Sequence, residues 1–450
     1  MTTLLRFAVL SGWGVLLVVV YVFGHRAIMR RYDHNTQRHG GNDDEHAATG
    51  PSCAKAIRRG EGEWIDLNAS AAHTATYQYA PECAALATQL FGSTLRLCEL
   101  EATDLQSRVV TSPERRAAQL ARVQRANAFV WQPSPACRAP RVDAARFADG
   151  LKGGRRLVII GDSLSKQHAI SLLCLLYPAI DLPATRRLRT GADFAHAFVL
   201  EHGGVVQFIF NDRLLEIAAS QPGSGGAAGG SRSIAPVATG SHGRNPTLAA
   251  TSVRYVEQPV SRDGTRNGRR FESWSRRIRF GPSGRADVIV LNTGAHWPLQ
   301  HEAAYRSMSH SVLAFLLDRD KATERFEGTV LYRTNFLPGC SSARHPTPAA
   351  PRAALAQSSY NWAALSRYDH IWAQTIDERA AAGVERDDAA TMKAEVGILN
   401  VSHLTSLRGD GHCEDCAAPG GAKEGSDCLH YCLPGPVDVW SALLQEIVMP

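Results

Sequence analysis

The sequence lacks the concentrated basic face of a nucleic-acid-binding protein. Its formal net charge is only +6 over 450 residues, and no basic stretch is interleaved with aromatic residues. Nucleic-acid binders concentrate Lys and Arg because affinity depends on neutralising phosphates. We therefore expect no nucleic-acid partner. The hydrophobic content of 44% and the charged content of 20% are those of a globular protein with a substantial core.

Long apolar runs are scarce as well, and one stands out near the N-terminus. Phe7–Gly24 has 18 residues without a charge. At about 1.5 Å per residue, a helix of that length spans about 27 Å, enough for a thin bilayer. The run lacks the small-residue exit that follows a cleaved signal peptide, since it ends in Val22-Phe23-Gly24-His25. We interpret it as an uncleaved transmembrane anchor.

Two signals disagree about the side of the membrane on which the rest of the chain lies. Three arginines follow the apolar run and one precedes it, which would keep the following chain in the cytoplasm. Ten cysteines and two N-glycosylation sequons, at Asn68 and Asn400, favour a secretory compartment with disulfides instead. Long domains translocate largely regardless of flanking charge. We therefore expect a single-pass protein whose body lies in a lumen.

Composition divides the chain into a short tail, the anchor, a stem, a cysteine-rich subdomain and a main domain, with bounds 1–6, 7–24, 25–52, 53–142 and 143–450. The stem is polar without periodicity, which predicts disorder. The cysteine-rich subdomain shows few strong strands, which predicts a disulfide-stapled cover packed on the main domain. Within the main domain, a Gly/Ser-rich stretch at 221–246 predicts a flexible insertion.

Strand and helix patterns alternate along the main domain. Short apolar runs predict buried strands at 157–160, 205–211, 286–292, 328–333 and 396–401. Helical spacing predicts helices from residue 164 to before 177, and at 303–317, 358–380 and 437–448. This alternation predicts an α/β fold with a three-layer, mostly parallel sheet. Active sites of such folds lie at the carboxyl ends of the strands.

A candidate nucleophile lies at one of these strand ends. Gly161-Asp162-Ser163 joins the first strand to the following helix. A serine there meets free backbone N–H groups and the positive end of the helix dipole, which stabilise negative charge. Nucleophiles of hydrolases occupy such strand-to-helix turns. The alternative is that Asp162 and Ser163 are only a helix N-cap.

A candidate base lies far downstream. Asp427 and His430 are three residues apart, and one turn of chain would put both side chains on the same side. The carboxylate would then orient the imidazole, which could take the proton of Ser163. One alternative is a disulfide-pinned surface turn with His430 as a bystander. Another is zinc bound by nearby cysteines such as Cys413 and Cys416, but cysteines in a lumen pair with one another, so we predict no metal.

These motifs together resemble the PC-esterase and trichome-birefringence-like family of SGNH/GDSL-like enzymes. The matching pieces are G-D-S-L at 161–164, N-T-G at 292–294 and D-x-x-H-x-C-L-P-G at 427–435, with Tyr332-Arg333-Thr334 as a further match. The resemblance extends from Cys53 to the C-terminus. It implies an SGNH-hydrolase-like fold and a membrane-anchored Golgi enzyme, with its catalytic domain in the lumen, that moves acetyl groups to polysaccharide hydroxyls.

The resemblance also implies roles for individual residues. Ser163 would be the nucleophile, His430 the base and Asp427 its orienting group. Asn292 would donate a hydrogen bond to the oxyanion beside the backbone N–H of Ser163, with Gly161, Asp162 and Gly294 as motif neighbours. Ala295 is inserted in the family's N-T-G-H-W run, and the glycine that completes the oxyanion hole has three candidates, Gly191, Gly203 and Gly204.

The implied reaction needs an acetyl donor of unknown identity but no cofactor. Ser163 would take the acetyl group, and a glycan hydroxyl would then receive it. With one membrane span, the protein would depend on a donor-supplying membrane partner or on a luminal donor. If water entered instead, the same residues would make a carbohydrate acetyl esterase. A further alternative is a non-catalytic glycan-binding protein on an SGNH-like fold.

Overall fold

The structure is a computed structural model. It describes residues 51–66, 79–91, 113–188, 196–214, 265–266, 269–270, 274, 277–280, 282–284, 287–297, 301–317, 326–338, 362–385, 394–413 and 427–449. The predicted anchor, nearly all of the stem, the 221–246 insertion, the Asn68 sequon and Gly191 lie outside these ranges. Among the described helices, none is long and apolar enough to cross a membrane.

A six-stranded sheet with the order β10-β9-β8-β3-β5-β4 forms the centre of the described structure. Neighbouring strands are parallel except β4 and β5, which are antiparallel. In chain order the strands are β3 (Arg156–Gly161), β4 (Ala197–Val199), β5 (Val205–Phe210), β8 (Val288–Leu291), β9 (Thr329–Arg333) and β10 (Glu395–Leu399). The prediction of an α/β fold with a mostly parallel sheet is confirmed, and the five predicted strands are present.

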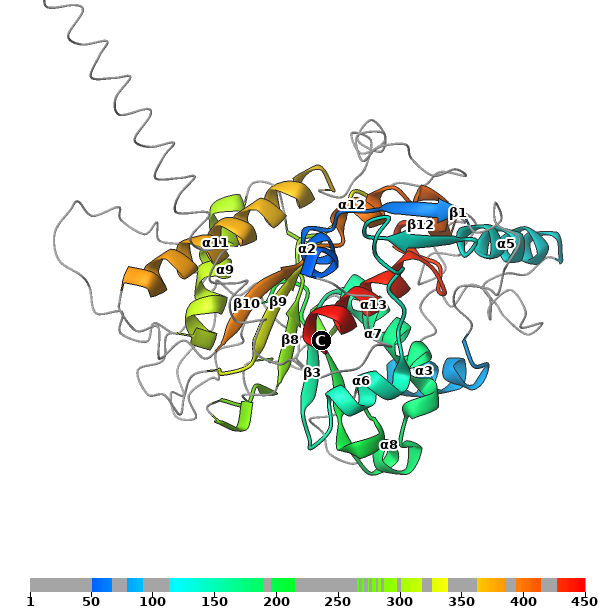
Figure 1. Cartoon of the computed structure of the whole chain (residues 1–450), viewed down its shortest axis with the longest axis horizontal. Coiled ribbons are helices and arrows are strands. Elements are labelled where there is room, and N and C mark those ends of the chain that lie inside the picture. The colour runs from blue at the N-terminus through cyan, green and yellow to red at the C-terminus, as the bar shows by residue number, and fades with distance from the viewer. Residues whose placement is uncertain are drawn as a thin grey trace, which may run out of the picture. The chain divides into compact units, whose positions relative to one another are not determined.

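Helices cover both faces of this sheet (Figure 1). On one face lie α7 (Ser163–Leu175) and α13 (Pro436–Val448), and on the other lie α9 (Glu302–Leu317) and α11 (Leu365–Glu385). The central strand β3 is buried along its whole length. Leu157 and Ile159 pack in the first core, and Val158 and Ile160 pack in the second. A strand buried on both faces reads as a continuous apolar run, which is why the sequence signal was strong here.

The cysteine-rich part of the chain packs on the α7 and α13 side and includes a two-stranded sheet. Its elements are α2 (Pro51–Arg59), β1 (Glu63–Asp66), α3 (Glu82–Phe91), α5 (Pro113–Ala126) and β2 (Phe129–Gln132), followed by α6 (Ala144–Gly150). Cys53 bonds to Cys137 within this part, and Cys83 in α3 bonds to Cys174 in α7. The predicted disulfides therefore occur, and one of them ties the cover to the helix that begins at Ser163.

The segment with the predicted turn at 427–430 is a strand, so that prediction is wrong. β12 (Asp427–Tyr431) pairs antiparallel with β11 (His412–Cys413). The pairing partner lies more than a dozen residues upstream, so the local pattern contained no sign of it. An extended strand does not by itself bring residues three apart to one side.

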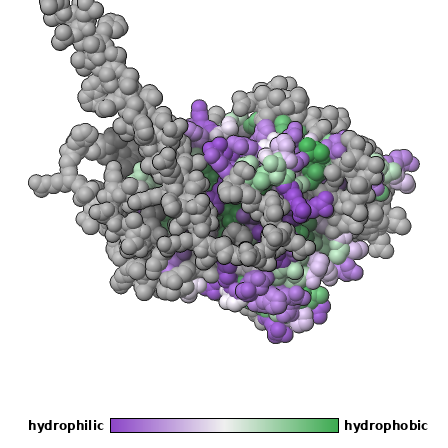
Figure 2. Space-filling model, in the orientation of Figure 1, coloured by the Kyte–Doolittle hydropathy of each residue, from purple (hydrophilic) through white to green (hydrophobic). Residues whose placement is uncertain are grey.

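Shorter elements complete the described fold. They are α8 (Leu182–Leu188), α12 (Ser402–Ser406), the hairpin of β6 (Thr265–Arg266) and β7 (Arg269–Arg270), and the 3₁₀ turns Tyr177–Ala179, Glu201–Gly203, Pro282–Gly284, Trp362–Ala364 and Gly409–Gly411. On the face drawn in Figure 2, the coloured residues are largely hydrophilic, with hydrophobic ones in small groups.

Candidate active site

Ser163 and His430 meet at the carboxyl end of the central strand. The Oγ of Ser163 and the Nε2 of His430 are 2.7 Å apart, although 267 residues separate them in sequence. Ser163 is the first residue of α7 and His430 lies in β12, and both side chains are half-buried. At this distance the hydroxyl proton can pass to the imidazole, which is the geometry of a serine nucleophile and its base.

The turn that presents Ser163 depends on close packing. A Cβ added to Gly161 would lie 2.3 Å from Ser165 Oγ and 2.5 Å from the carbonyl oxygen of Asn292, so only glycine fits. Asp162 is the N-cap of α7, and its Oδ1 accepts a hydrogen bond of 2.9 Å from the N–H of Leu164. The helix thus begins at the nucleophile, with its free N–H groups beside the hydroxyl.

Hydrogen bonds to the backbone of His430 and of the next residue, Tyr431, hold the base in place. Gln167, one turn after Ser163 on α7, accepts from the N–H of Tyr431 at 3.1 Å and donates to its carbonyl oxygen. The Nδ1 of His412 lies 2.9 Å from the carbonyl oxygen of His430, and the rings of His412 and Tyr431 stack. The helix that carries the nucleophile therefore also fixes the strand that carries the base.

The third predicted member, Asp427, is only partly described. Its backbone begins β12 and pairs with Cys413, but its side chain lies outside the described residues. Its role as the orienting carboxylate stays a prediction.

Asn292 follows β8 directly and is fully buried beside the nucleophile turn. Its backbone N–H donates to the carbonyl oxygen of Ile160 at 3.0 Å. Its side-chain amide donates to the carbonyl oxygen of Arg333 at 2.8 Å and to Oδ1 of Asn335 at 3.3 Å. Both amide hydrogens thus have protein partners here, and an oxyanion would have to replace the longer of these two bonds.

A polar network that the sequence reasoning missed holds the turn after Asn292. Asn335 donates through its side chain to the carbonyl oxygen of Thr293, the hydroxyl of Tyr332 and the carboxylate of Asp369, and through its backbone N–H to that carboxylate again. Burial raises the pKa of Asp369 to about 6, and its hydrogen bonds to Asn335 and Tyr332 limit the rise. Gly294 has a φ of +153°, and a Cβ there would lie 2.9 Å from Asn335 Nδ2.

One sequence signal could have found Asn335. It lies just beyond the end of β9, with Thr334 between, and Asn292 follows the end of the neighbouring strand β8 directly. Polar residues just beyond parallel strands meet at one edge of the sheet.

Gly203 and Gly204 are at the wrong end of the sheet for an oxyanion hole. They immediately precede β5, and Val205 is paired with Arg156 at the start of β3, while Ser163 follows the end of β3. About 17 Å of strand separates the two edges at about 3.3 Å per residue. These two candidates are therefore excluded.

The zinc alternative loses two of its sulfur ligands, while the side chain of Cys413 and all of Cys416 lie outside the described residues. Cys428 and Cys432 are both in disulfides, and the Nε2 of His430 faces Ser163. Among the described residues, no group of His, Cys, Asp and Glu is arranged to hold a metal ion.

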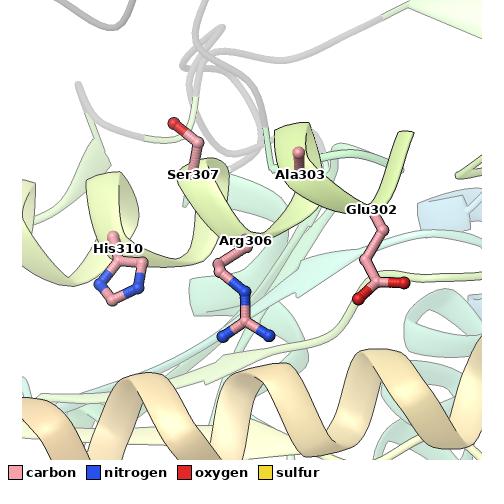
Figure 3. Close-up of a pocket in the computed structure, with 5 residues that line it drawn as sticks. All are labelled: Glu302, Ala303, Arg306, Ser307 and His310. Carbon is pink, nitrogen blue, oxygen red and sulfur yellow. The ribbon is translucent and has the colours of Figure 1, made fainter. Parts of the chain in front are cut away.

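A surface pocket on α9 is separate from this site. It is lined by Glu302, Ala303, Arg306, Ser307 and His310, all on one helix (Figure 3). Arg306 bonds to Gln374 and Glu302 pairs with Arg367, so two of these side chains tie α9 to α11. These two contacts join α9 to α11, so a structural role explains the side chains of Arg306 and Glu302.

Comparison with known proteins points to one family. The family described as PC-Esterase, "GDSL/SGNH-like Acyl-Esterase family found in Pmr5 and Cas1p", matches residues 139–231 and 348–447, which contain Ser163 and His430. A "Probable xylan O-acetyltransferase 8" of Oryza sativa subsp. japonica is 23% identical over 336 residues, covering 68% of this chain and 65% of that protein.

Two Arabidopsis thaliana proteins give matches of the same kind. "Xyloglucan O-acetyltransferase 1" is 24% identical over 71% of this chain and 69% of its own length. "Protein trichome birefringence-like 42" is 23% identical over 71% of this chain and 77% of its own length. The chain thus spans a little under two thirds of the rice relative and somewhat more of these two.

Proposed function

Because the chain belongs to the PC-esterase family, we propose that it is a polysaccharide O-acetyltransferase that works through an acetyl-enzyme on Ser163. The observation that carries this proposal is the 2.7 Å contact between Ser163 Oγ and His430 Nε2 at the carboxyl edge of the sheet. Relatives bear the names of xylan and xyloglucan O-acetyltransferases, which suggests a polysaccharide of that class as the acceptor.

The first half-reaction forms the acetyl-enzyme. Ser163 Oγ attacks the carbonyl carbon of the acetyl donor while His430 takes the hydroxyl proton. The tetrahedral intermediate then expels the donor's leaving group, which receives the proton from His430. In the second half-reaction a sugar hydroxyl gives its proton to His430 and attacks the acetyl carbon, and Ser163 regains its proton as it leaves.

The oxyanion of each intermediate needs donors at the same edge. The backbone N–H of Ser163, at the first position of α7, is one. Asn292 is the second in this proposal, and it would exchange its 3.3 Å bond to Asn335 for one to the oxyanion. Asp427 would hold the neutral tautomer of His430.

The proposed setting is the Golgi membrane, with Phe7–Gly24 as a single-pass anchor and the catalytic domain in the lumen. The Cys53–Cys137 and Cys83–Cys174 disulfides favour an oxidising compartment. The donor would come from a luminal pool or from a partner membrane protein.

A carbohydrate acetyl esterase is the second candidate, because the same pair of side chains serves hydrolysis when water reaches the acetyl-enzyme. The test is to incubate the protein with an acetyl donor and with xylan or xyloglucan oligosaccharides and to weigh the products. Acetylated oligosaccharide supports the transferase, whereas free acetate with every acceptor supports the esterase. A Ser163→Ala variant with full activity would overturn the assignment of the nucleophile, whereas a wild type that forms neither product would favour the non-catalytic glycan-binding alternative.

A further inference from the structure

A buried arginine lies behind the nucleophile turn, and the mechanism above does not use it. Arg333 is the last residue of β9 and is fully buried. Its guanidinium lies 4.4 Å from the centre of the Trp440 ring, and its Nη2 is 3.5 Å from Ser165 Oγ. Its Nε and Nη1 have no hydrogen-bond partner among the described residues. Burying a charge with so few hydrogen bonds costs stability, so its presence calls for an electrostatic reason.

That reason is found in Asp162. This residue is also fully buried, and while its Oδ1 caps α7 its Oδ2 has no hydrogen-bond partner among the described residues. Arg333 lies close to this turn, since its Nη2 is 3.5 Å from Ser165 Oγ, the atom against which Gly161 packs. Burial lowers the pKa of Arg333 to about 10, and the carboxylate of Asp162 acts against this lowering. Asp369 is already satisfied by Asn335 and Tyr332.

The neighbouring histidine does not supply a second cation. His168 is fully buried on α7, with its ring edge-on to Trp440. Burial and the nearby Arg333 hold the pKa of His168 well below its usual value, so its ring is neutral. Arg333, and not His168, is therefore a buried cation whose charge interacts with that of Asp162.

The charge of Asp162 bears directly on the reaction. Asp162 immediately precedes Ser163, and acyl transfer places negative charge on the oxyanion beside Ser163. Two like charges in a site of low dielectric repel each other strongly. An ionised Asp162 without a counter-charge would therefore oppose the step that the helix N-terminus favours.

We propose that Arg333 is a positioning residue that offsets the buried negative charge of Asp162, so that Asp162 can cap α7 without opposing the charge that develops at Ser163. This inference rests on the proposed function only in taking Ser163 as a nucleophile. It requires no particular acetyl donor or acceptor.

The test measures the reactivity of Ser163 directly. A fluorophosphonate probe reacts when Ser163 Oγ attacks phosphorus, fluoride leaves and the hydroxyl proton passes to His430, so negative charge develops as in acyl transfer. The rate of labelling of the full-length protein is compared for the wild type, Arg333→Met, Arg333→Lys, Asp162→Asn and the double variant Asp162→Asn/Arg333→Met. Asparagine is itself a good N-cap residue, so Asp162→Asn removes the charge and keeps the cap.

We expect Arg333→Met to slow labelling on the order of tenfold or more, and Arg333→Lys to retain most of the rate. The double variant should react within about threefold of Asp162→Asn, because the charge that Arg333 offsets is gone. A matched control is Arg156→Met, which removes a buried arginine paired with Asp287 at the opposite edge of the sheet. It should lower thermal stability and leave the labelling rate unchanged.

Two results would overturn the inference while leaving the nucleophile intact: Arg333→Met labelled as fast as the wild type, or a double variant no faster than Arg333→Met. Should Arg333→Met fail to fold, the double variant decides. A folded and reactive double variant supports the charge role, and one that also fails to fold assigns Arg333 to packing. A wild type that is not labelled, or is labelled elsewhere than at Ser163, overturns the proposed nucleophile and this inference together.

Discussion

Gln167 forms two hydrogen bonds with the backbone of Tyr431, accepting from its N–H at 3.1 Å and donating to its carbonyl oxygen. Both residues are buried. Gln167 lies four residues after Ser163 on α7, and Tyr431 directly follows His430. The nucleophile and its base are therefore held together by this contact between Gln167 and Tyr431, which lie 264 residues apart in sequence.

Replacing Gln167 with leucine should separate the two catalytic side chains. The change leaves the N–H and carbonyl of Tyr431 without partners, which costs about 1–3 kcal/mol of unfolding free energy. Because misplacement by about 1 Å can cost about 100-fold in rate, we expect kcat to fall by about tenfold or more. Urea unfolding and steady-state transfer assays measure the two effects.

A suitable control is Thr375→Val, which removes a buried hydroxyl paired with Ser309 between α9 and α11. It should cost about 1 kcal/mol of stability and leave kcat unchanged. A Gln167→Leu variant with wild-type kcat would show that β12 is placed by its other contacts.

Ser163 and His430 should act as one unit. Ser163→Ala and His430→Ala should each lower transfer on the order of 10³-fold or more, and the double variant should be no worse than either single one. Both positions are half-buried at the helix start and strand end, so thermal unfolding should change little. Transfer assays on the three variants decide this, and independent, multiplying losses would contradict the pairing.

The sequence predicted the central part of this architecture well, because buried parallel strands carry their own signal. The runs that became β3, β8 and β9 are buried on both faces, and such strands read as unbroken apolar segments. β4 was missed because it has three residues and pairs only at the sheet edge.

The site was harder to predict, because its supports come from distant segments. Ser163 could be singled out from its turn, and His430 from its motif. Gln167, Asn335 and Arg333 look like ordinary helix or strand-end residues until α7, β9 and β12 are brought together. The extended conformation of β12 depends on its pairing with β11, which no local pattern records.

Gly161→Ala should be severely damaging. The added Cβ would lie 2.3 Å from Ser165 Oγ and 2.5 Å from the backbone oxygen of Asn292, and the backbone cannot move without shifting both strands. We expect a loss of about 2 kcal/mol or more of stability, by analogy with overpacked cores, and a large loss of activity. The matched control is Gly153→Ala, where φ is +72° and no atom lies within 4 Å. It should cost about 1 kcal/mol through its backbone conformation alone and leave activity intact.

Stability should fall as the pH rises from about 4 to about 6, in part because of Asp438. Burial raises the pKa of Asp438 from 3.8 to about 6, although Ser171, Tyr79 and the N–H of Gly435 donate to it. The folded protein therefore holds this proton more tightly than the unfolded chain. The resulting stabilisation is fully present below the unfolded pKa and is lost as the pH rises through the folded pKa.

The loss from this one group is at most about 3 kcal/mol. Denaturant unfolding between pH 4 and 7.5 measures it. Asp438→Asn should flatten the decline, since asparagine does not titrate. An equally steep decline in the variant would assign the effect to other groups, of which Asp369, with its pKa also raised to about 6, is the first.

The Asn400 sequon should stay unmodified in the folded protein. The Nδ2 atom that would carry a glycan donates to the carbonyl oxygen of Arg59 at 2.8 Å, and Oδ1 accepts from the N–H of Ser402 at 3.3 Å. Gly60 packs so closely that a Cβ there would lie 2.8 Å from Asn400 Cγ. A sugar on Nδ2 would displace the end of α2 from the strand end of β10. Peptide mass spectrometry of protein from a eukaryotic secretory host tests this, with Asn400→Gln as the control. A glycosidase-sensitive mass that disappears in that variant would show that the contact with Arg59 is not made in the mature protein.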